Sequence, residues 1–388
     1  MKPSRILSAE PSFFLLLLFL FSIHLSIALC YVVFTVLALV MFADLWRRGF
    51  DLPLPRFVWS FLPFIAATLL ATAFSVSPWI SLRDNKELFV FLLLPIFMTV
   101  IDSPSRLRRA LGAALLSALV SAGAGLISAT VRGISLHHRL KGFTSHWMTF
   151  SGLLMMTLIF FAILLWSPGL RKYRLGLGLA LIPIAIALLF SLTRSAWVGL
   201  VAALVFFFFS WRPRWILPSL ALALILFFLL PTPVKDRFRS IVDPHDPSNR
   251  DRFFMVYTGL HIARDYPVTG VGANNVPFVY PRYMHPAAEH PNLHLHNNFL
   301  QILAERGVIG LLALLFAFVA VIADLLRIVK SNESETVRWL GRASLGVFIG
   351  FLVAGLFEYN FGGSQIKFLL FFFLSIPFTR AATRGERT

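Results

Sequence analysis

Long apolar stretches alternate with short polar turns along most of the chain. Each stretch approaches the roughly 20 apolar residues that a membrane-spanning helix needs, and the turns are basic or contain Pro or Gly. Twelve stretches fall at about 8–25, 27–45, 57–74, 86–101, 109–130, 147–166, 175–191, 195–210, 215–231, 308–327, 343–358 and 363–379. Only Ser22, His24 and Ser26 mark a break between the first two. The pattern predicts an all-α integral membrane protein with about twelve transmembrane helices.

The composition supports this fold class. Hydrophobic residues make up 58% of the 388 residues and charged residues 14%, whereas soluble domains are about 25% charged. The net charge of +17 would suggest a nucleic-acid partner in a soluble protein. In a membrane protein the same excess is expected in cytoplasmic loops, so we predict no nucleic-acid partner. A single cysteine, Cys30, excludes an internal disulfide.

The first apolar stretch has one competing interpretation. Lys2 and Arg5 precede it, as basic residues precede the apolar region of a signal peptide. However, the apolar run continues well past Cys30, which is too long for such a region. We therefore expect a retained first helix.

Basic residues orient the predicted helices. They recur at every second turn, and they all face the cytoplasm if the N-terminus does. These residues are Arg47, Arg48, Arg56, Arg106, Arg108, Arg109, Arg171, Lys172, Arg174, Arg212, Arg214, Arg327, Lys330, Arg338, Arg342, Arg380, Arg384 and Arg387. An even number of spans then predicts that both termini are cytoplasmic.

One long polar segment, 231–307, breaks the charge rule, because it falls outside and is still basic. It carries Lys235, Arg237, Arg239, Arg250, Arg252, Arg264, Arg282, Arg306, His245, His285, His290, His294 and His296. A second basic cluster, from Arg132 to His146, lies in another outer loop and includes Arg139. An anionic ligand on the outer face would explain both clusters. We treat residues 1–388 as a single polytopic membrane domain, with 231–307 as a catalytic loop within it.

Arg194 stands between two apolar stretches in the segment SLTRSAW (191–197). A charge so close to hydrocarbon is costly unless it is paired or lines a wet cavity. Its planar guanidinium can hold phosphate oxygens through two parallel hydrogen bonds. An interfacial arginine that reaches lipid headgroups would give the same pattern, and both interpretations stay open.

A second constellation, in the outer loop, begins with Arg250 and Arg252. Positions 252–263 mix apolar and polar residues at helical spacing, as in an amphipathic helix on a membrane surface. Gly270 and Gly272 then indicate a tight turn. They do not form a dinucleotide fingerprint, because no strand is predicted before them. The arginines are candidates for phosphate binding, and contact with anionic lipid is the alternative.

The third constellation is the segment HLHNNFLQILAERGVIGL (294–311). Asn297 or Asn298 can cap a short helix, Gly307 can end it, and an apolar stretch follows at once. His296 would then lie at the edge of the bilayer. Histidine is the side chain best suited to act as a base near neutral pH, although an ordinary loop histidine is the simpler alternative.

Two places in the outer loop carry residues that could bind a metal ion. Asp243, Asp246 and Asp251 are possible cation ligands, but the first two precede prolines and are typical of turns. Zinc binding has no recognisable motif with a water-activating carboxylate among the histidines His285, His290, His294 and His296. The sequence predicts no metal and no other cofactor.

Together these residues resemble the O-antigen ligase and polymerase superfamily of bacterial envelope glycosyltransferases. The resemblance runs from about 139 to 366, and the segment GFTSHWMTF (142–150) also resembles a block that precedes a span in some members. It depends on three motifs in a fixed order. The first is TRSAW (193–197), and the second is Arg252 with Pro267, Gly270 and Gly272. The third is His296 and Asn297, followed by Glu305, Gly307 and Gly310.

The resemblance implies a Gram-negative inner-membrane enzyme whose periplasmic site passes a glycan from undecaprenyl pyrophosphate to an acceptor hydroxyl. It assigns pyrophosphate binding to Arg194 and Arg252, with Arg250 as the alternative to Arg252, and the general base to His296. His294 is a further substrate-binding candidate. The supporting candidates are Asn297, Glu305, Gly270, Gly272, Arg139 and His146. Without an obvious carboxylate nucleophile, a single inverting displacement is the simplest mechanism.

The acceptor is the least determined part of this hypothesis. A ligase would use lipid A-core, a polymerase the next lipid-linked repeat, and a related transferase a protein. The moderate outer loop and compact chain favour a ligase. A lipid-glycan transporter is the alternative from another class, but transporters place polar residues deep within several spans. Here the polar residues gather at one face, with Glu358 as the main exception.

Overall fold

The computed structural model describes residues 9–48, 54–136 and 138–384. Within this part of the chain every regular element is a helix, as the sequence predicted. The elements are α1 Glu10–Ser22, α2 Ile27–Arg48, α3 Arg56–Ser60, α4 Leu62–Ala73, α5 Pro78–Asp84, η1 Asn85–Leu92, α6 Leu93–Val100, α7 Pro104–Arg132, α8 Trp147–Leu164, η2 Pro168–Tyr173, α9 Arg174–Phe190, α10 Arg194–Trp211, η3 Pro213–Trp215, α11 Ile216–Leu229, α12 Thr232–Arg239, α13 Pro247–Asp265, α14 Val276–Tyr283, α15 Asn298–Lys330, α16 Glu335–Ala354, η4 Asn360–Gly362, α17 Ser364–Ser375, η5 Ile376–Phe378 and α18 Arg380–Arg384.

Nine helices in the described residues are long and apolar enough to cross a membrane. Two shorter apolar helices, Glu10–Ser22 and Pro213–Leu229, lie where the first and ninth spans were predicted. The predicted span 86–101 is divided between η1 and α6, and only α6 is α-helical. The structure therefore shows an all-α membrane protein, and the predicted count of twelve spans is not confirmed. Lys2, Arg5 and Arg387 lie outside the described residues.

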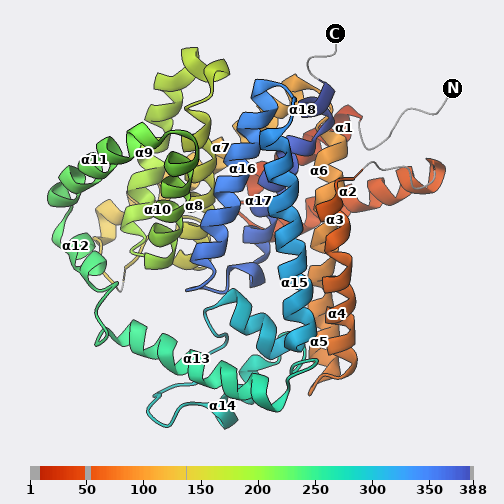
Figure 1. The fold of residues 1–388 in the computed structure, drawn as a ribbon, viewed down its shortest axis with the longest axis vertical. Helices are drawn as coiled ribbons and strands as arrows, with labels where there is room; N and C mark the ends of the chain where they lie inside the picture. The colour runs from red at the N-terminus through yellow and green to blue at the C-terminus, as the bar shows by residue number, and fades with distance from the viewer. Residues whose placement is uncertain (1–8, 49–53, 137, 385–388) are drawn as a thin grey trace.

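The apolar helices form a bundle, and α13 and α14 cross it at one end (Figure 1). α16 packs against α8, α10 and α15, and small residues allow the close approach. A Cβ at Gly199 would lie 2.6 Å from the carbonyl oxygen of Gly350. Small residues at helix contacts are typical of membrane proteins, where backbones must approach closely to gain packing energy.

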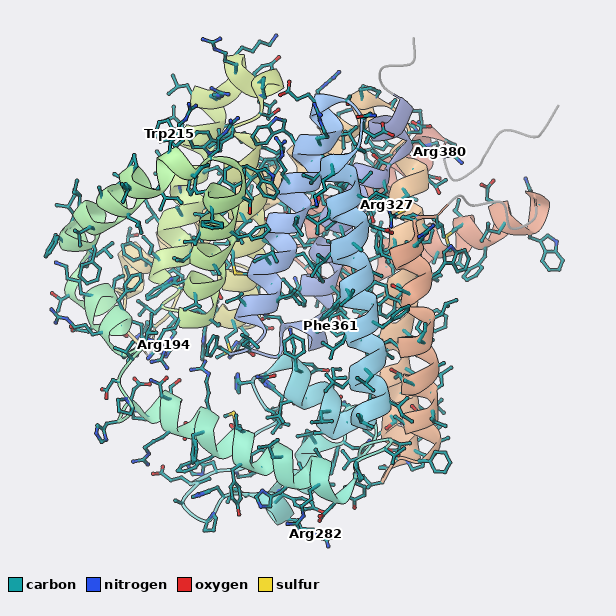
Figure 2. The ribbon with its side chains drawn as sticks, in the orientation of Figure 1. Arg194, Trp215, Arg282, Arg327, Phe361 and Arg380 are labelled. Atoms are coloured by element: carbon teal, nitrogen blue, oxygen red, sulfur yellow. The ribbon has the colours of Figure 1, made fainter. Side chains whose placement is uncertain are left out.

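Basic residues from different turns gather at opposite ends of the bundle. Arg327 and Arg380 lie at the end that carries α18, whereas Arg282 lies at the end with α13 and α14 (Figure 2). The sequence placed these two groups on opposite sides of the membrane. Arg282, from the predicted outer loop, therefore lies at the opposite end from Arg327 and Arg380, which are predicted to be cytoplasmic.

α15 consists of two helices that are broken at Gly307, where φ is 62° and ψ is −168°. The turn 267–272 lies against this break. The Val308 N–H donates to the Pro267 carbonyl (2.8 Å), and the Gly272 N–H donates to the Glu305 carbonyl (2.9 Å). The short helix that begins at Asn298 and ends at Gly307, with an apolar helix after it, is the arrangement that the sequence predicted.

Candidate functional site

The histidine motif is attached to the turn that follows α16. Asn297 caps α15, and its side-chain oxygen accepts hydrogen bonds from two backbone N–H groups. The buried Asn298 donates its own N–H to the Gly355 carbonyl (2.7 Å) and accepts from the Phe361 N–H (2.9 Å). Because both bonds are made to one turn, residues 294–298 are held against residues 355–361.

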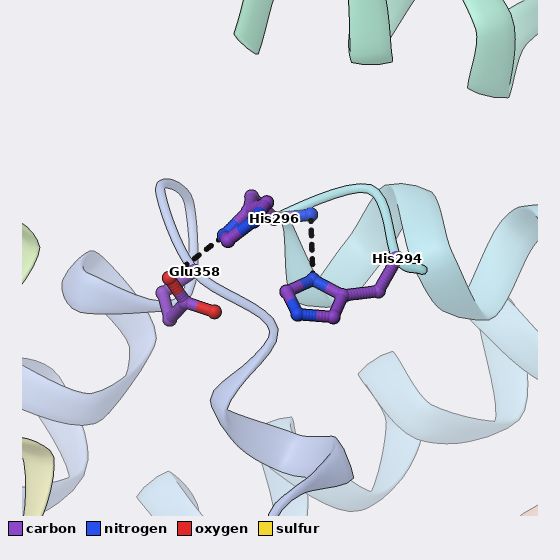
Figure 3. A group of neighbouring side chains, drawn as sticks. All are labelled: His294, His296 and Glu358. Carbon is purple, nitrogen blue, oxygen red and sulfur yellow. Dashed lines mark hydrogen bonds and ion pairs between the residues drawn. The ribbon is translucent and has the colours of Figure 1, made fainter. Parts of the chain in front are cut away.

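This attachment brings His296 to Glu358. The Nδ1 atom of His296 lies 2.8 Å from a carboxylate oxygen of Glu358, whose side chain is 7% exposed (Figure 3). His296 has a left-handed backbone conformation, with φ of 46°, which is unfavourable for a residue with a Cβ. Its N–H donates to Nδ1 of His294 (3.4 Å). The strained backbone directs the ring to the carboxylate.

Charges in this group follow from burial and pairing. Burial would raise the pKa of Glu358, but the hydrogen bond from His296 and the electrostatic influence of His296, His294 and Arg252 outweigh it, so the pKa is lowered. Burial and the neighbouring His296 lower the pKa of His294 to about 4. Glu358 is therefore ionised and His294 neutral near pH 7, which lets His294 accept the hydrogen bond from His296.

Arg194 is the first residue of α10 and is 5% exposed. Its guanidinium donates to the carbonyl (2.6 Å) and hydroxyl (3.0 Å) of Ser240 and to the hydroxyl of Ser248 (3.0 Å), and it forms an ion pair with Asp246 (3.1 Å). Trp197, one turn later, stacks on Phe238 of α12. The segment 193–197 thus holds the beginning of the outer loop against the bundle.

The charge of Arg194 acts on three more arginines. Arg252 donates to the Ser248 hydroxyl (3.1 Å), and Arg237 lies 3.6 Å from Asp246. Burial is the first cause of a lowered pKa for Arg139, Arg237 and Arg252, and the positive charge of Arg194 is the second.

We call Arg139, Arg194, Arg237 and Arg252 the arginine cluster. Asp246 balances part of its charge through ion pairs with two members. Arg250 is exposed. The structure thus brings Arg252, and not Arg250, next to Ser248.

Asp243 and Asp246 have the turn roles that their prolines indicated. Asp243 accepts from the His245 N–H (2.9 Å), and Asp246 caps α13 by accepting from the Asn249 N–H (3.2 Å). Asp246 has a further role that the sequence analysis missed, because its carboxylate also pairs with Arg194 and Arg237.

Gly270, Gly272 and Glu305 fix the turn against α15. A Cβ at Gly270 (φ 67°) would lie 2.3 Å from the backbone carbon of Glu305. The Glu305 carboxylate is buried and accepts from the Asn274 N–H (3.0 Å), from Gln301 (2.8 Å) and from Arg306 (2.7 Å). These contacts stabilise the helix that carries the histidine motif.

Two cavities adjoin the junction between the arginine cluster and the histidines. A small one of about 70 Å³ is lined by Arg194, Arg252 and Phe357 among others. A larger one of about 560 Å³ is lined by His146, His294 and Glu358 among others. Phe357 and Glu358 are consecutive, so their Cα atoms are about 3.8 Å apart. The two cavities therefore have walls in adjacent residues of one turn.

His146 and Arg139 join this region from the other outer loop. His146 caps α8 by accepting from the Met148 N–H (3.2 Å), and burial lowers its pKa. The Arg139 guanidinium lies over the Trp147 ring, 5.0 Å from its centroid. Both supporting candidates from the 132–146 cluster thus lie near the residues of the long loop.

One group in the described residues has the spacing of metal ligands. Ligand atoms of His294, His296 and Glu358 lie within 4.8 Å of one another. Of the four loop histidines His285, His290, His294 and His296, this group contains the last two, and its carboxylate comes from Glu358. In this arrangement Nδ1 of His296 is already hydrogen-bonded to Glu358.

Glu358 and Arg237 are the main members of this region to which the sequence analysis gave no role. In the sequence, Glu358 is an acidic residue near the end of a predicted span, and Arg237 is one of many loop arginines. The acidic residue at a span end was a usable signal, because such a charge needs a partner. Nothing in the local sequence around Arg237 distinguishes it from Arg239, which is exposed.

Residues 179–315 match the model of a family described as O-antigen ligase. The matched segment contains Arg194, Arg252 and His296, in the order on which the resemblance depended. A comparison with curated proteins finds no match for this chain. Together with the all-helical membrane architecture, this match over residues 179–315 supports the O-antigen ligase and polymerase superfamily that the resemblance indicated.

Proposed function

We propose that this protein is an O-antigen ligase that transfers a polysaccharide from undecaprenyl pyrophosphate to a lipid A-core acceptor. The observation that carries the proposal is the position of the His296–Glu358 pair beside the arginine cluster, through the consecutive residues Phe357 and Glu358. The site would face the periplasm of a Gram-negative inner membrane, with both termini in the cytoplasm. Residues 231–307 then form the catalytic loop of a single membrane domain.

The arginine cluster supports binding of the pyrophosphate. After burial, the positive charge of Arg194 is the next cause that lowers the pKa of Arg139 and of Arg252, which means that these charges repel. An anion with several negative charges would relieve this repulsion. Arg194 and Arg252 both contact the Ser248 hydroxyl, so they can approach one diphosphate together and stabilise the charge that grows on it as it leaves.

His296 is proposed as the general base. With Nδ1–H donated to Glu358, the neutral ring has its lone pair on Nε2. Nε2 takes the proton of the acceptor hydroxyl as its oxygen forms a bond to the anomeric carbon. The bond from that carbon to the pyrophosphate oxygen breaks, and its electron pair leaves on the pyrophosphate. One displacement inverts the anomeric configuration and needs no nucleotide.

The proposal is tested with lipopolysaccharide and lipid-linked glycans from cells that carry the native protein or His296→Ala. Bare lipid A-core with accumulated long lipid-linked chains in the variant is expected for a ligase. Core that carries a single repeat would instead assign the protein as a polymerase. An unchanged pattern would contradict a catalytic role of His296.

The transporter alternative is distinguished with purified protein in lipid nanodiscs, where no second compartment exists. Turnover of an undecaprenyl-pyrophosphate-linked glycan with lipid A-core is expected of a transferase. Binding of the donor without any cleavage by the purified protein would favour the transporter interpretation.

A further inference from the structure

The larger cavity, of about 560 Å³, is not lined by any member of the arginine cluster. It lies between η1, the first half of α15 and the turn 358–363, and its walls include Asp84, Glu87 and Tyr359. Its volume is within the range of small-molecule sites. One wall is formed by His294 and Glu358, and both residues contact His296. A molecule in this cavity would therefore lie next to two residues that contact the proposed base.

Ion pairing leaves the cavity without a spare cation among the charged residues that line it. Arg306 pairs with Glu305 (2.7 Å), and Lys367 pairs with Glu87 (2.8 Å). In the described structure Asp84 makes neither a cap hydrogen bond to η1 nor a salt bridge, although it lies near Arg306 and Lys367. Its carboxylate is thus available as a hydrogen-bond acceptor.

The two cavities differ in charge. Arg194 and Arg252 line the small one. The large one is lined by two cations, Arg306 and Lys367, that pair with the lining carboxylates of Glu305 and Glu87. The carboxylates of Asp84 and Glu358 also line it and have no lysine or arginine of the lining as an ion-pair partner. A phosphate group in the large cavity would lie near these two carboxylates without an unpaired cation, and like charges at short range are unfavourable.

We infer that the large cavity receives the acceptor as an uncharged sugar and excludes a phosphorylated one. Sugar hydroxyls donate to carboxylates such as Asp84, and the C–H faces of a sugar ring pack against aromatic rings such as Phe91 and Tyr359. This inference rests on the proposed function, because it places the acceptor hydroxyl beside His296.

Binding is tested without turnover by protecting a cysteine from a maleimide. Leu293 lines the cavity and is 77% exposed, so Leu293→Cys in a Cys30→Ala background introduces an accessible thiol. Val242→Cys is the matched control, because Val242 is 85% exposed and is absent from the cavity lining. The probes are neutral methyl disaccharides of gluco, galacto and manno configuration, each paired with its phosphate ester, with the protein in nanodiscs.

At least one neutral disaccharide is expected to slow labelling of Leu293→Cys and not of Val242→Cys, and its phosphate ester is expected to protect at least tenfold more weakly. Adding Asp84→Asn should raise the half-protecting concentration about tenfold, since a charged hydrogen-bond acceptor is lost. Glu289→Gln, an exposed carboxylate change, should not. Equal protection by the phosphate ester, or no protection by any disaccharide, would overturn the inference.

The two proposals fail in different ways. If the protein never cleaves a lipid-pyrophosphate glycan but neutral sugars still protect Leu293→Cys, the transferase proposal fails and the sugar site stands. If the protein cleaves the donor and the disaccharides give no protection, the acceptor site proposed here is wrong and the transferase proposal stands.

Discussion

Nδ1 of His296 and the buried carboxylate of Glu358 lie 2.8 Å apart, although 62 positions separate the two residues in the sequence. The hydrogen bond joins the end of the outer loop to the turn after α16. It also fixes which nitrogen of the imidazole carries a proton, and thereby which one can act as a base.

Glu358→Gln should therefore lower kcat on the order of a hundredfold, because the amide can stabilise the wrong tautomer and does not stabilise the imidazolium. We expect little change in KM for the donor, since the arginine cluster is intact. Steady-state kinetics with purified protein measure the split. A merely structural role would instead lower Tm and raise KM, and Glu289→Gln is the control.

Arg194→Ala and Arg252→Ala should each lower kcat/KM on the order of a hundredfold, because each removes a cation from the proposed pyrophosphate site. Arg250→Ala is the matched control, since Arg250 is exposed and lies two residues from Arg252 on the same helix. Rates near the native value in both Ala variants would contradict the pyrophosphate assignment. Loss of activity in Arg250→Ala alone would transfer the role to Arg250.

Gly307→Ala should destabilise the protein strongly. The residue has φ of 62°, and a Cβ would lie 2.1 Å from the Val268 carbonyl oxygen, so the backbone must move. Gly176→Ala, in α9 with nothing within 4 Å of the added Cβ, should be neutral or stabilising by up to about 1 kcal/mol. Thermal unfolding in detergent measures both, and equal Tm values would contradict the close docking of the turn 267–272.

Acid should destabilise the histidine motif. The pKa of His294 is about 4 in the folded protein and about 6.5 when exposed, so the unfolded state binds more protons between these values. Stability is then lost as the pH falls from about 6.5 towards 4. His294→Gln should weaken this acid dependence of Tm, whereas His290→Gln, at an exposed position, should not. Identical pH dependences in the two variants would show that His294 is not the responsible group.

Chelation should leave the activity unchanged. Positive charge at the proposed donor site comes from arginines, and Nδ1 of His296 is engaged by Glu358. The measurement is the transfer rate before and after EDTA. A loss of activity that Zn²⁺ restores would instead assign His294, His296 and Glu358 as ligands of a required metal.

Local sequence rules predicted the elements of this protein well. Apolar length gave the all-helical membrane class, and Asn297 and Gly307 gave the bounds of the short helix in α15 because capping and helix termination depend on nearby residues. They did not predict that the stretch 86–101 begins as the 3₁₀ helix η1 and becomes α-helical only at α6.

Apolar length and local motifs were enough to predict the membrane class, the long basic loop, and the candidates Arg194, Arg252 and His296. The pairing of Glu358 with His296, the contacts of Asp246 with Arg194 and Arg237, and the exposure of Arg250 appear only in the folded protein. These relations depend on how the start of α10 and the turns after α12 and α16 meet at one end of the bundle. Contacts between distant segments arise from helix packing. The residues that neighbour one side of such a contact in the sequence do not indicate which residue lies on the other side.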